Sequence, residues 1–348
     1  MTIKPSVVHT SLGVVLGLVL FLFTFGVEQY YRYHVSNLRS LDGKEHGYYI
    51  YPHMSVDSVL NMVRQDYNIS GELDLRWHMH LKVFKEAKPG YYVFPDEMGD
   101  KLFIGKLQSG DQTPIQLKWT NAIRTREELA GKIASQLMLD SVAIIERLSD
   151  NRYMAEFDLN AENSRCLFIP NTYEVYWTIT PDQLFKRMDR EYRAFWTEER
   201  RSKAEAKGLT PAEVAILASI VECETYIPKD MPIIASLYIN RLRKGMPLQA
   251  CPTVIYAVGD FSLRRVLKSH LKVESPYNTY QNNGLPPGPI LCPLPRTMDF
   301  VLNAPKTDYL YMCANPSLDG THIFSSSYGI HTSAARNYHR MMNQRHIR

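Results

Sequence analysis

Apolar residues run almost without interruption near the N-terminus. Between residues 14 and 27 every position is apolar or glycine apart from Thr24, and the apolar character extends back toward Val7. At a rise of about 1.5 Å per residue, roughly 20 helical residues cross the hydrocarbon core of a membrane. The run therefore predicts a transmembrane anchor over residues 11–28.

The flanks of this run predict its orientation and whether it is removed. Lys4 precedes the run and Glu28 follows it, which favours a cytoplasmic N-terminus over residues 1–10. The small-x-small pattern of a signal-peptide cleavage site is absent from residues 24–28, so we expect the anchor to stay uncleaved. The remainder of the chain is then expected on the extracytoplasmic side of the inner membrane.

A small α/β module is predicted at residues 47–118, after a juxtamembrane connector at residues 29–46. Apolar residues at helical spacing follow Ser55, a suitable N-cap, and aromatic residues alternate in a strand before the module ends. The order is strand, helix, helix and strand, followed by one more helix: 47–51, 56–63, 73–84, 91–94 and 103–107. His78 and His80 lack further acidic or histidine neighbours, so no metal site is predicted there.

The region at residues 119–208 is predicted to be intermediate between this module and a third domain. It follows a predicted strand at residues 115–119, and Thr125 with Glu128 matches a capping box that opens a helix. An aromatic segment surrounds Pro170, and one amphipathic, heavily charged helix is predicted over residues 181–207.

The helix that begins at Thr210 carries the most informative side chain. Residues 210–213, Thr-Pro-Ala-Glu, combine a capping box with proline at the first helical position. Val214, Leu217, Ile220 and Val221 form a buried stripe, and the next step of that stripe is Glu224. Burial disfavours the charged form of a carboxyl group and raises its pKa, as a general acid near neutral pH requires.

The neighbouring acidic residues are predicted to have other roles. Glu222 lies two residues before Glu224, about 200° away around the helix axis, so the two carboxylates cannot form a close dyad. Asp230 is predicted to N-cap the next helix, which runs over residues 231–243 and ends at Gly245. Residues 246–256 are predicted to form a polar loop suited to sugar hydroxyls and acetamides.

Charge and cysteine content exclude several classes of function. The chain has 40 basic and 36 acidic residues, a formal charge of +4 and no run of five like charges, so no nucleic-acid partner is predicted. Its five cysteines form no CxxC pair and no metal-ligand spacing, which argues against zinc. No cofactor is predicted.

Ordered motifs between Thr210 and His331 resemble those of the MltG/YceG-like endolytic murein transglycosylases. The segments that carry the resemblance are 217–225 (LASIVECET), 240–242, 245–246, 248–249, 252–256, 277–280, 284–288, His322 and 324–325. The resemblance implies an α+β chain with a transmembrane helix, a LysM-like module at 47–118 and a mixed α+β catalytic domain at 209–348. It also implies that Glu224 is the catalytic acid.

The resemblance further implies the reaction and its setting. Glu224 would cleave the bond between N-acetylmuramic acid and N-acetylglucosamine in nascent glycan strands, leave 1,6-anhydro ends and so terminate elongation. The expected partners are peptidoglycan strands and the inner membrane, with peptidoglycan synthases as candidate protein partners. The candidates for holding the glycan are Gln249, Thr253, Tyr256, Tyr277, Asn278 and His322.

Two departures from the family pattern and two other functions stay open. Cys223 stands where the family usually has a charged residue, and Cys251 stands where it usually has aspartate. A silent peptidoglycan-binding scaffold would explain the module but not a carboxylate on a buried stripe. A muramidase-type hydrolase would need another acid to activate water, and the only acids between Asp230 and Lys306 are Asp260, Glu274 and Asp299.

Overall fold

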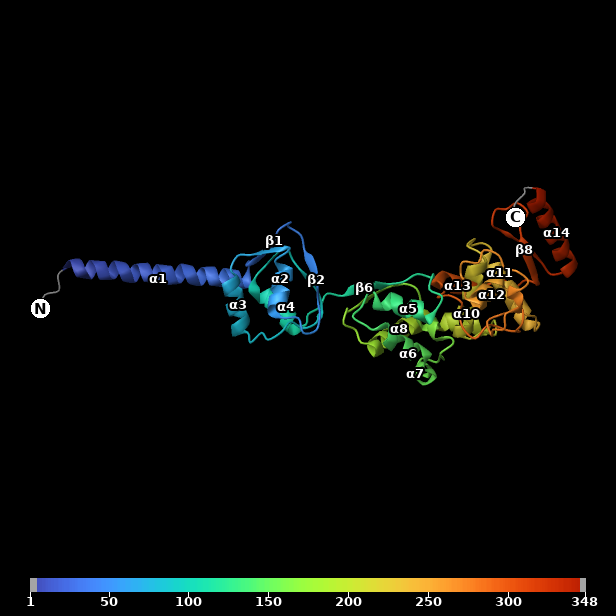
Figure 1. Ribbon diagram of the computed structural model, residues 1–348, viewed down its shortest axis with the longest axis horizontal. Helices are drawn as coiled ribbons and strands as arrows, with labels where there is room; N and C mark the ends of the chain where they lie inside the picture. Colours follow the sequence, from blue (N-terminus) through green and yellow to red (C-terminus); the bar gives the residue numbers. More distant parts are fainter. Residues whose placement is uncertain (1–4, 345–348) are drawn as a thin grey trace. The chain divides into compact units, whose positions relative to one another are not determined.

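The computed structural model describes residues 5–344 and divides into two compact units (Figure 1). Unit 1 comprises Met1–Gln116 and Glu174–Thr178, and unit 2 comprises Leu117–Tyr173 and Ile179–Arg348. Both contain helices and strands, so the predicted α+β class is confirmed. The predicted cytoplasmic segment lies partly outside the described residues, because residues 1–4 are not among them.

Unit 1 consists of a long N-terminal helix and a small module of short strands and helices. Its elements within the described chain are α1 (Pro5–His34), β1 (Leu38–Ser40), β2 (His46–Ile50), α2 (Val56–Val63), β3 (Tyr67–Ile69), α3 (Glu72–Leu81), β4 (Gly90–Phe94), β5 (Glu97–Met98) and α4 (Asp100–Ser109). The predicted strands and helices of the module are thus present. The segment Leu12–His34 is long and apolar enough to cross a membrane, and no residue of its apolar 18-residue window is buried.

The segment predicted as a connector, residues 29–46, differs from the prediction. It contains the last turns of α1 and strand β1, which is the central strand of the antiparallel sheet β3-β1-β5. Leu38 of β1 is fully buried in the module core, beside Leu60 and Phe103. A three-residue strand with one buried apolar side chain is too short to show the alternation that identifies strands in a sequence.

The end of α1 is fixed to the module by polar and packing contacts. Gln29 donates to the Asp74 carboxylate at 3.1 Å, and Arg32 forms an ion pair with the same carboxylate. The ring of Tyr33 lies 4.8 Å from that of His78, whose Nδ1 bonds to the buried Asp100 carboxylate at 2.6 Å. The C-terminal end of α1 is therefore fixed against helix α3 of the module.

The remaining described elements belong to unit 2, except that the strands β6 and β7 belong partly to each unit, because the chain passes between the units within them. They are β6 (Ile115–Lys118), α5 (Arg126–Ala134), α6 (Ser141–Ser149), α7 (Asn151–Ala155), η1 (Ser164–Leu167), β7 (Thr172–Val175), α8 (Pro181–Phe195), α9 (Glu198–Glu205), α10 (Pro211–Glu224), α11 (Met231–Arg243), α12 (Cys251–Val258), η2 (His270–Lys272), α13 (Pro295–Leu302), β8 (Tyr311–Ala314), β9 (His322–Ser325) and α14 (Tyr328–Gln344).

The single helix predicted over residues 181–207 is two helices, α8 and α9. The break falls at Trp196, whose indole is 2% exposed, and at Thr197, whose hydroxyl accepts from the Arg200 amide and caps α9. Polar and apolar residues continue at helical spacing across the break, so the sequence pattern does not reveal it. Burial of the indole is a tertiary contact that local periodicity cannot show.

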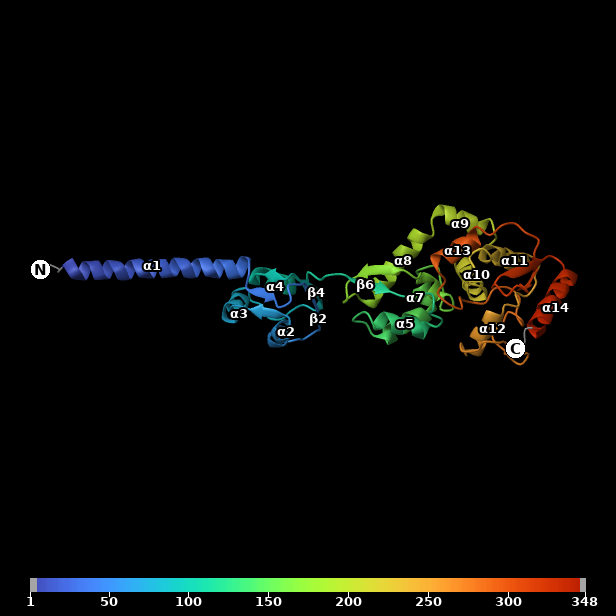
Figure 2. The ribbon, with the colours of Figure 1, turned by 90° about the horizontal axis from the view of Figure 1, so that it is seen from above.

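Helix α10 is the centre of unit 2, and it packs against α11, α12 and α13 (Figures 1 and 2). Its predicted start is confirmed, because Thr210 and Glu213 form the capping box with proline in the first turn. The predicted buried stripe is only part of the buried surface, since every residue of 214–221 is buried. Residues of η1 and α9 also pack on α10, so the predicted regions 119–208 and 209–348 share one compact unit.

Candidate active site

Glu224 is the last residue of α10, at the point where the buried helix reaches a pocket. The following residue, Thr225, is extended and ends the helix, and its hydroxyl accepts from the Ile227 amide at 3.0 Å. The pocket has a volume of about 370 Å³. Helix α10 therefore delivers a half-buried carboxyl group from the core of unit 2 to a solvent-accessible hollow.

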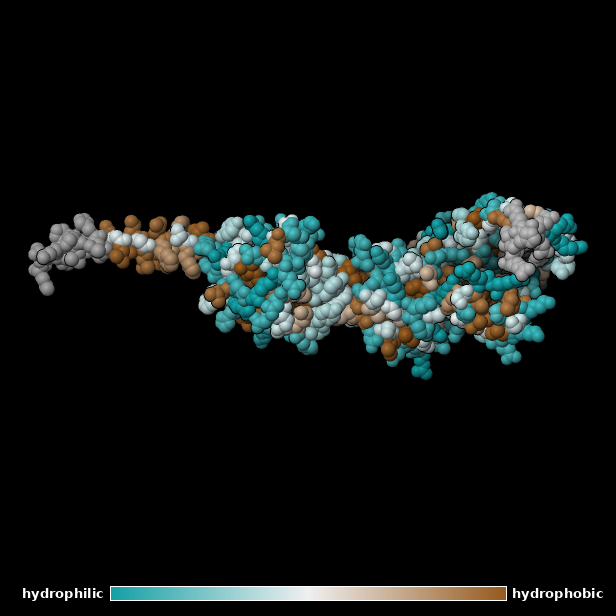
Figure 3. Space-filling model, turned by 45° about the horizontal axis from the view of Figure 1, so that its top comes forward, coloured by the Kyte–Doolittle hydropathy of each residue, from teal (hydrophilic) through white to brown (hydrophobic). Residues whose placement is uncertain are grey.

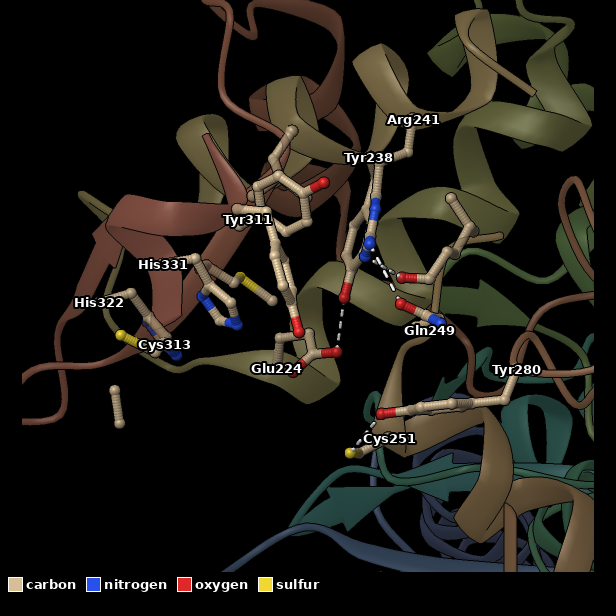
Figure 4. A pocket seen from close by; sticks show the side chains of 15 residues that line it. Glu224, Tyr238, Arg241, Gln249, Cys251, Tyr280, Tyr311, Cys313, His322 and His331 are labelled. Atoms are coloured by element: carbon tan, nitrogen blue, oxygen red, sulfur yellow. Dashed lines mark hydrogen bonds between the residues drawn. The ribbon is translucent and has the colours of Figure 1, made fainter. Parts of the chain in front are cut away.

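The pocket is assembled from separate parts of unit 2 (Figure 4). Glu224 lies between Cys251 and Tyr280 on one side and Cys313, His322 and His331 on the other. These residues come from α10, the first residue of α12, the segment between η2 and α13, the hairpin β8-β9 and α14. The complete lining is Glu224, Leu237, Tyr238, Arg241, Leu248, Gln249, Cys251, Tyr280, Tyr311, Met312, Cys313, Ala314, His322, Tyr328 and His331.

Tyr238 of α11 holds the Glu224 carboxyl group. Its hydroxyl donates to Oε1 of Glu224 at 2.6 Å, and its side chain is 1% exposed. Burial raises the pKa of Glu224 to about 7, while the Tyr238 hydrogen bond acts in the opposite direction because it favours the charged form. Burial also raises the pKa of Tyr238, so the phenol keeps the proton that it donates.

Arg241 and Gln249 form a second polar group in the pocket. The Arg241 guanidinium donates from Nη1 to the Leu248 carbonyl at 2.9 Å and from Nη2 to Oε1 of Gln249 at 3.1 Å. Gln249 has a positive φ of 53°, a conformation that costs energy for a residue other than glycine. Since its oxygen is occupied by Arg241, the amide nitrogen of Gln249 is the group left to donate to a ligand.

His322 is fixed in the pocket wall by a buried acid. The Asp230 carboxylate accepts from the His322 backbone amide at 2.8 Å and contacts its Nδ1 at 3.1 Å. Asp230 occupies the predicted N-cap position of α11, but its side chain makes no cap hydrogen bond and binds His322 instead. The partner of the Asp230 side chain, His322, lies in a strand more than 90 residues later, and local sequence patterns cannot indicate such a contact.

The predicted glycan-binding residues divide into two groups. Gln249 and His322 line the same pocket as Glu224, whereas the other four candidates do not line it. Thr253 and Asn278 are fully buried. The Thr253 hydroxyl donates to the Ala250 carbonyl at 2.8 Å, and the Asn278 amide donates to the carbonyls of the segment before it.

The tilted rings of Tyr256 and Tyr277 contact one another outside the pocket lining. Their ring centroids are 4.6 Å apart. The Tyr256 hydroxyl accepts from Arg165 at 2.9 Å, and the Tyr277 hydroxyl donates to Glu162 at 3.2 Å. Residues 251–258, predicted to belong largely to a loop, form helix α12. These contacts give four of the six candidates a part in shaping unit 2.

Glu222 faces away from the pocket, in the direction that the helix geometry predicts. Its carboxylate accepts from the Leu294 amide at 2.9 Å and from the Asn121 side chain. It therefore connects α10 to the start of α13 and to the segment before α5. This position gives Glu222 a structural role separate from the site of Glu224.

Most of the aromatic and basic residues around Glu224 were not predicted from the sequence. Tyr238, Arg241 and Tyr280 lie in segments already singled out, yet none was assigned to the site. A usable signal existed for Tyr238, because a tyrosine on a buried helix face needs a hydrogen-bond partner. Within the described residues, no cluster of three or more His, Cys, Asp or Glu side chains is arranged to hold a metal ion.

Comparison with known proteins shows the family of this chain. A model of the YceG-like family matches residues 48–337. The chain belongs to the YceG-like family. An endolytic murein transglycosylase of Bacillus subtilis is 28% identical over 307 residues, which covers 84% of this chain and 84% of that protein.

Two further proteins resemble this chain. An endolytic murein transglycosylase of Streptococcus pneumoniae is 26% identical over 269 residues, which covers 67% of this chain and 48% of that protein. The crystal structure of a YceG-like protein from Listeria monocytogenes matches with a TM-score of 0.54 and 24% identity. It covers 83% of this chain and 98% of the Listeria chain, and it shares the fold.

Replacing Glu224 with Gln is expected to stabilise unit 2 more at pH 8 than at pH 5. A carboxyl group with a raised pKa in the folded state stabilises it below the unfolded value, near 4.5, and loses that contribution as pH rises through about 7. The amide of the variant would not titrate, so the gap between variant and wild type should widen by up to about 3 kcal/mol. Urea unfolding followed through Trp119 and Trp196 measures it; an equal gap at both pH values would contradict the assignment.

Replacing Tyr238 with Phe is expected to raise the pKa of Glu224 further, by about one unit, since a hydrogen bond to the charged form is lost. Titration of the carboxyl carbon of Glu224 by ¹³C NMR measures the shift. Tyr280→Phe is the matched control, because its hydroxyl contacts the Cys251 sulfur at 3.4 Å rather than Glu224. An equal shift in both variants would show that the Tyr238 bond is not the cause.

Proposed function

We propose that this chain is a membrane-anchored endolytic lytic transglycosylase that cleaves peptidoglycan between N-acetylmuramic acid and N-acetylglucosamine. Family membership and relatives named endolytic murein transglycosylases support the class of reaction. The observation that carries the mechanism is the Glu224 carboxyl group, buried enough for its pKa to reach about 7 while it still lines a pocket. Such a group is protonated in a large fraction of molecules at neutral pH.

The first step uses Glu224 as a general acid. Oε1 already accepts from Tyr238, so the acidic proton is carried by Oε2. Donation of this proton to the glycosidic oxygen breaks the bond to C1 of the muramoyl residue and releases the neighbouring sugar as an alcohol. Positive charge develops at C1, beside a carboxylate that has just become negative.

The second step uses the same residue as a general base. The Glu224 carboxylate accepts the proton of the muramoyl C6 hydroxyl while that oxygen bonds to C1, which closes a 1,6-anhydro ring and restores the acid. No water is consumed. The nucleophile belongs to the substrate, so its attack is intramolecular and needs no second catalytic carboxylate to recruit it.

The arrangement of acids in unit 2 supports this reaction over hydrolysis. Among the described residues that line the pocket, Glu224 is the only carboxylate. Asp299 is paired with Arg200 at 2.8 Å, Asp260 accepts from the Ser262 hydroxyl at 2.6 Å, and Glu274 is exposed outside the pocket. A hydrolase would require one of them to activate water beside the sugar.

Other groups of the pocket suit a polar sugar strand. Gln249 offers an amide donor and His322 an imidazole held by Asp230, and both face the space beside Glu224. Arg241 adds a positive charge, which would attract the carboxylate groups of the peptides carried by the muramoyl residues. We assign Gln249, Arg241 and His322 to binding of the glycan.

The setting of the reaction is part of the proposal. Helix α1 has the length and composition of a membrane span, which would hold the enzyme at the inner membrane, with the pocket outside the cytoplasm. Residues 47–118 would act as the LysM-like module, and nascent strands and their synthases would be the nearby partners. A silent scaffold is disfavoured by a carboxyl group whose pKa suits catalysis.

Glu224→Gln should abolish glycan cleavage, with a loss in turnover of about 10²-fold to 10⁴-fold or more, because the amide has no acidic proton to donate. Release of soluble fragments from purified glycan strands measures the activity. Glu222→Gln is the matched control and should retain most of it, since the amide oxygen can still accept from the Leu294 amide. Normal cleavage by Glu224→Gln would refute the mechanism. An equal loss of activity in both variants would contradict the assignment of catalysis to the face of α10 that carries Glu224.

The products should carry 1,6-anhydro ends and be lighter by one water than the products of a hydrolase. The reason is that the C6 hydroxyl, rather than water, takes the place of the leaving sugar. Mass spectrometry of the fragments separates the two reactions, with a muramidase digest of the same strands as the reference. Reducing ends in place of anhydro ends would show that the enzyme is a hydrolase.

A further inference from the structure

Helix α3 of unit 1 carries a row of large apolar side chains on its outer face. Leu73, Trp77 and Leu81 follow one another at four-residue spacing and are 84%, 59% and 59% exposed. Residues at this spacing lie on one face of a helix. Val83, directly after the helix, is 68% exposed. We call these four residues the α3 patch.

Helix α3 is firmly packed on the module, although the α3 patch is exposed. The opposite side of α3 packs in the module core through Leu75 and Met79, which are 0% and 5% exposed. Val83 has a φ of 53°, which is unfavourable for a β-branched residue. The packed helix and the strained backbone at Val83 thus hold apolar side chains on the surface. Contiguous apolar surface of this kind marks an interaction site.

The contacts of α1 place α3 close to the membrane surface. The apolar run of α1 ends at Val27, and Gln29, which bonds to Asp74 of α3, lies only about 3 Å further along the helix axis. Tyr33, which packs on His78 of α3, lies about 9 Å beyond Val27. Helix α3 is therefore at the depth of the lipid headgroups when α1 spans the bilayer.

The orientation of α3 agrees with this depth. In Figures 1 and 2, α3 lies at the end of the module from which α1 leaves, and Figure 3 shows apolar surface on the module beside the base of α1. Tyr30 and Tyr31 of α1 are 65% and 48% exposed at the same level. Tryptophan and tyrosine are the residues that favour the boundary between headgroups and hydrocarbon.

We propose that the α3 patch is an interfacial membrane anchor that inserts Leu73, Trp77, Leu81 and Val83 into the headgroup and acyl boundary of the bilayer that α1 crosses. The proposal rests on α1 as the membrane span. Lys82, which is exposed beside the patch, is positioned to contact anionic headgroups. Together, a span and an interfacial helix fix the tilt of the module on the membrane, which one span alone leaves free.

The tryptophans of the chain provide a direct test. Trp119, Trp177 and Trp196 are at most 5% exposed, whereas Trp77 is 59% exposed. The full chain is assembled into nanodiscs that contain brominated or ordinary phosphatidylcholine with phosphatidylglycerol. The contribution of Trp77 is the difference between the wild type and Trp77→Phe. We expect brominated lipid to remove most of this contribution and aqueous iodide to leave most of it.

A matched control moves the indole to the other end of the module. Tyr51 is 54% exposed, follows strand β2 and contacts Trp177 with ring centroids 4.8 Å apart. In the variant Trp77→Phe/Tyr51→Trp, the new indole should be quenched by iodide and not by brominated lipid. This variant has the same number of tryptophans as the wild type, so the comparison isolates the position of the exposed indole.

Three results would overturn the proposal, and they are distinguishable. Trp77 quenched by iodide alone would mean that the α3 patch faces water. Trp77 quenched by neither agent would mean that protein covers it, such as a second copy of this chain. A chain that does not enter nanodiscs would remove α1 as the span and the proposal with it, while the glycan-cleavage assay of Glu224→Gln would still test the proposed reaction separately.

Discussion

The position of one carboxyl group depends on a helix that is buried on all sides. Residues 214–221 of α10 are enclosed by neighbouring helices, so the helix cannot rotate or shift without opening the core of unit 2. Its last residue, Glu224, is therefore held where the core meets the pocket. Burial raises the pKa of Glu224, and the Tyr238 hydroxyl limits that rise to about 7. The two opposing effects leave a group that can both donate and accept a proton near neutral pH.

The segments around this carboxyl group are held in place by residues that do not line the pocket. The Ser219 hydroxyl of α10 accepts from the Ile290 amide at 3.0 Å, which fixes the segment before α13 to the central helix. Thr279 accepts from the Ala250 amide at 3.0 Å and bonds to the Thr253 hydroxyl at 2.8 Å, which fixes the turn that carries Gln249. Polar motif residues thus serve the site by holding loops, and they resemble ligand-binding residues in sequence because both jobs need hydrogen bonds.

The sequence predicted the features of the fold that depend on contacts between residues close together in the chain. The capping box at Thr210 and the glycine stop at Gly245 are set by contacts within a few residues, and the structure has both. Strand β1, the break at Trp196 and the partner of Asp230 were not predicted. Each depends on a contact between residues far apart in the chain. For the same reason the sequence identified Glu224 by its place on α10 but did not find Tyr238, which reaches it from the next helix.

The cysteine at position 251 simplifies the electrostatics of the site. The family resemblance places aspartate there, and a second carboxylate in the same pocket would raise the pKa of Glu224 by like-charge repulsion. Burial raises the pKa of the Cys251 thiol, which therefore stays neutral. In this chain the acidity of Glu224 is set by burial and Tyr238 without a carboxylate at position 251. A neutral thiol is also a poor base for activating water, so Cys251 agrees with the proposed reaction, in which the substrate's own hydroxyl is the nucleophile.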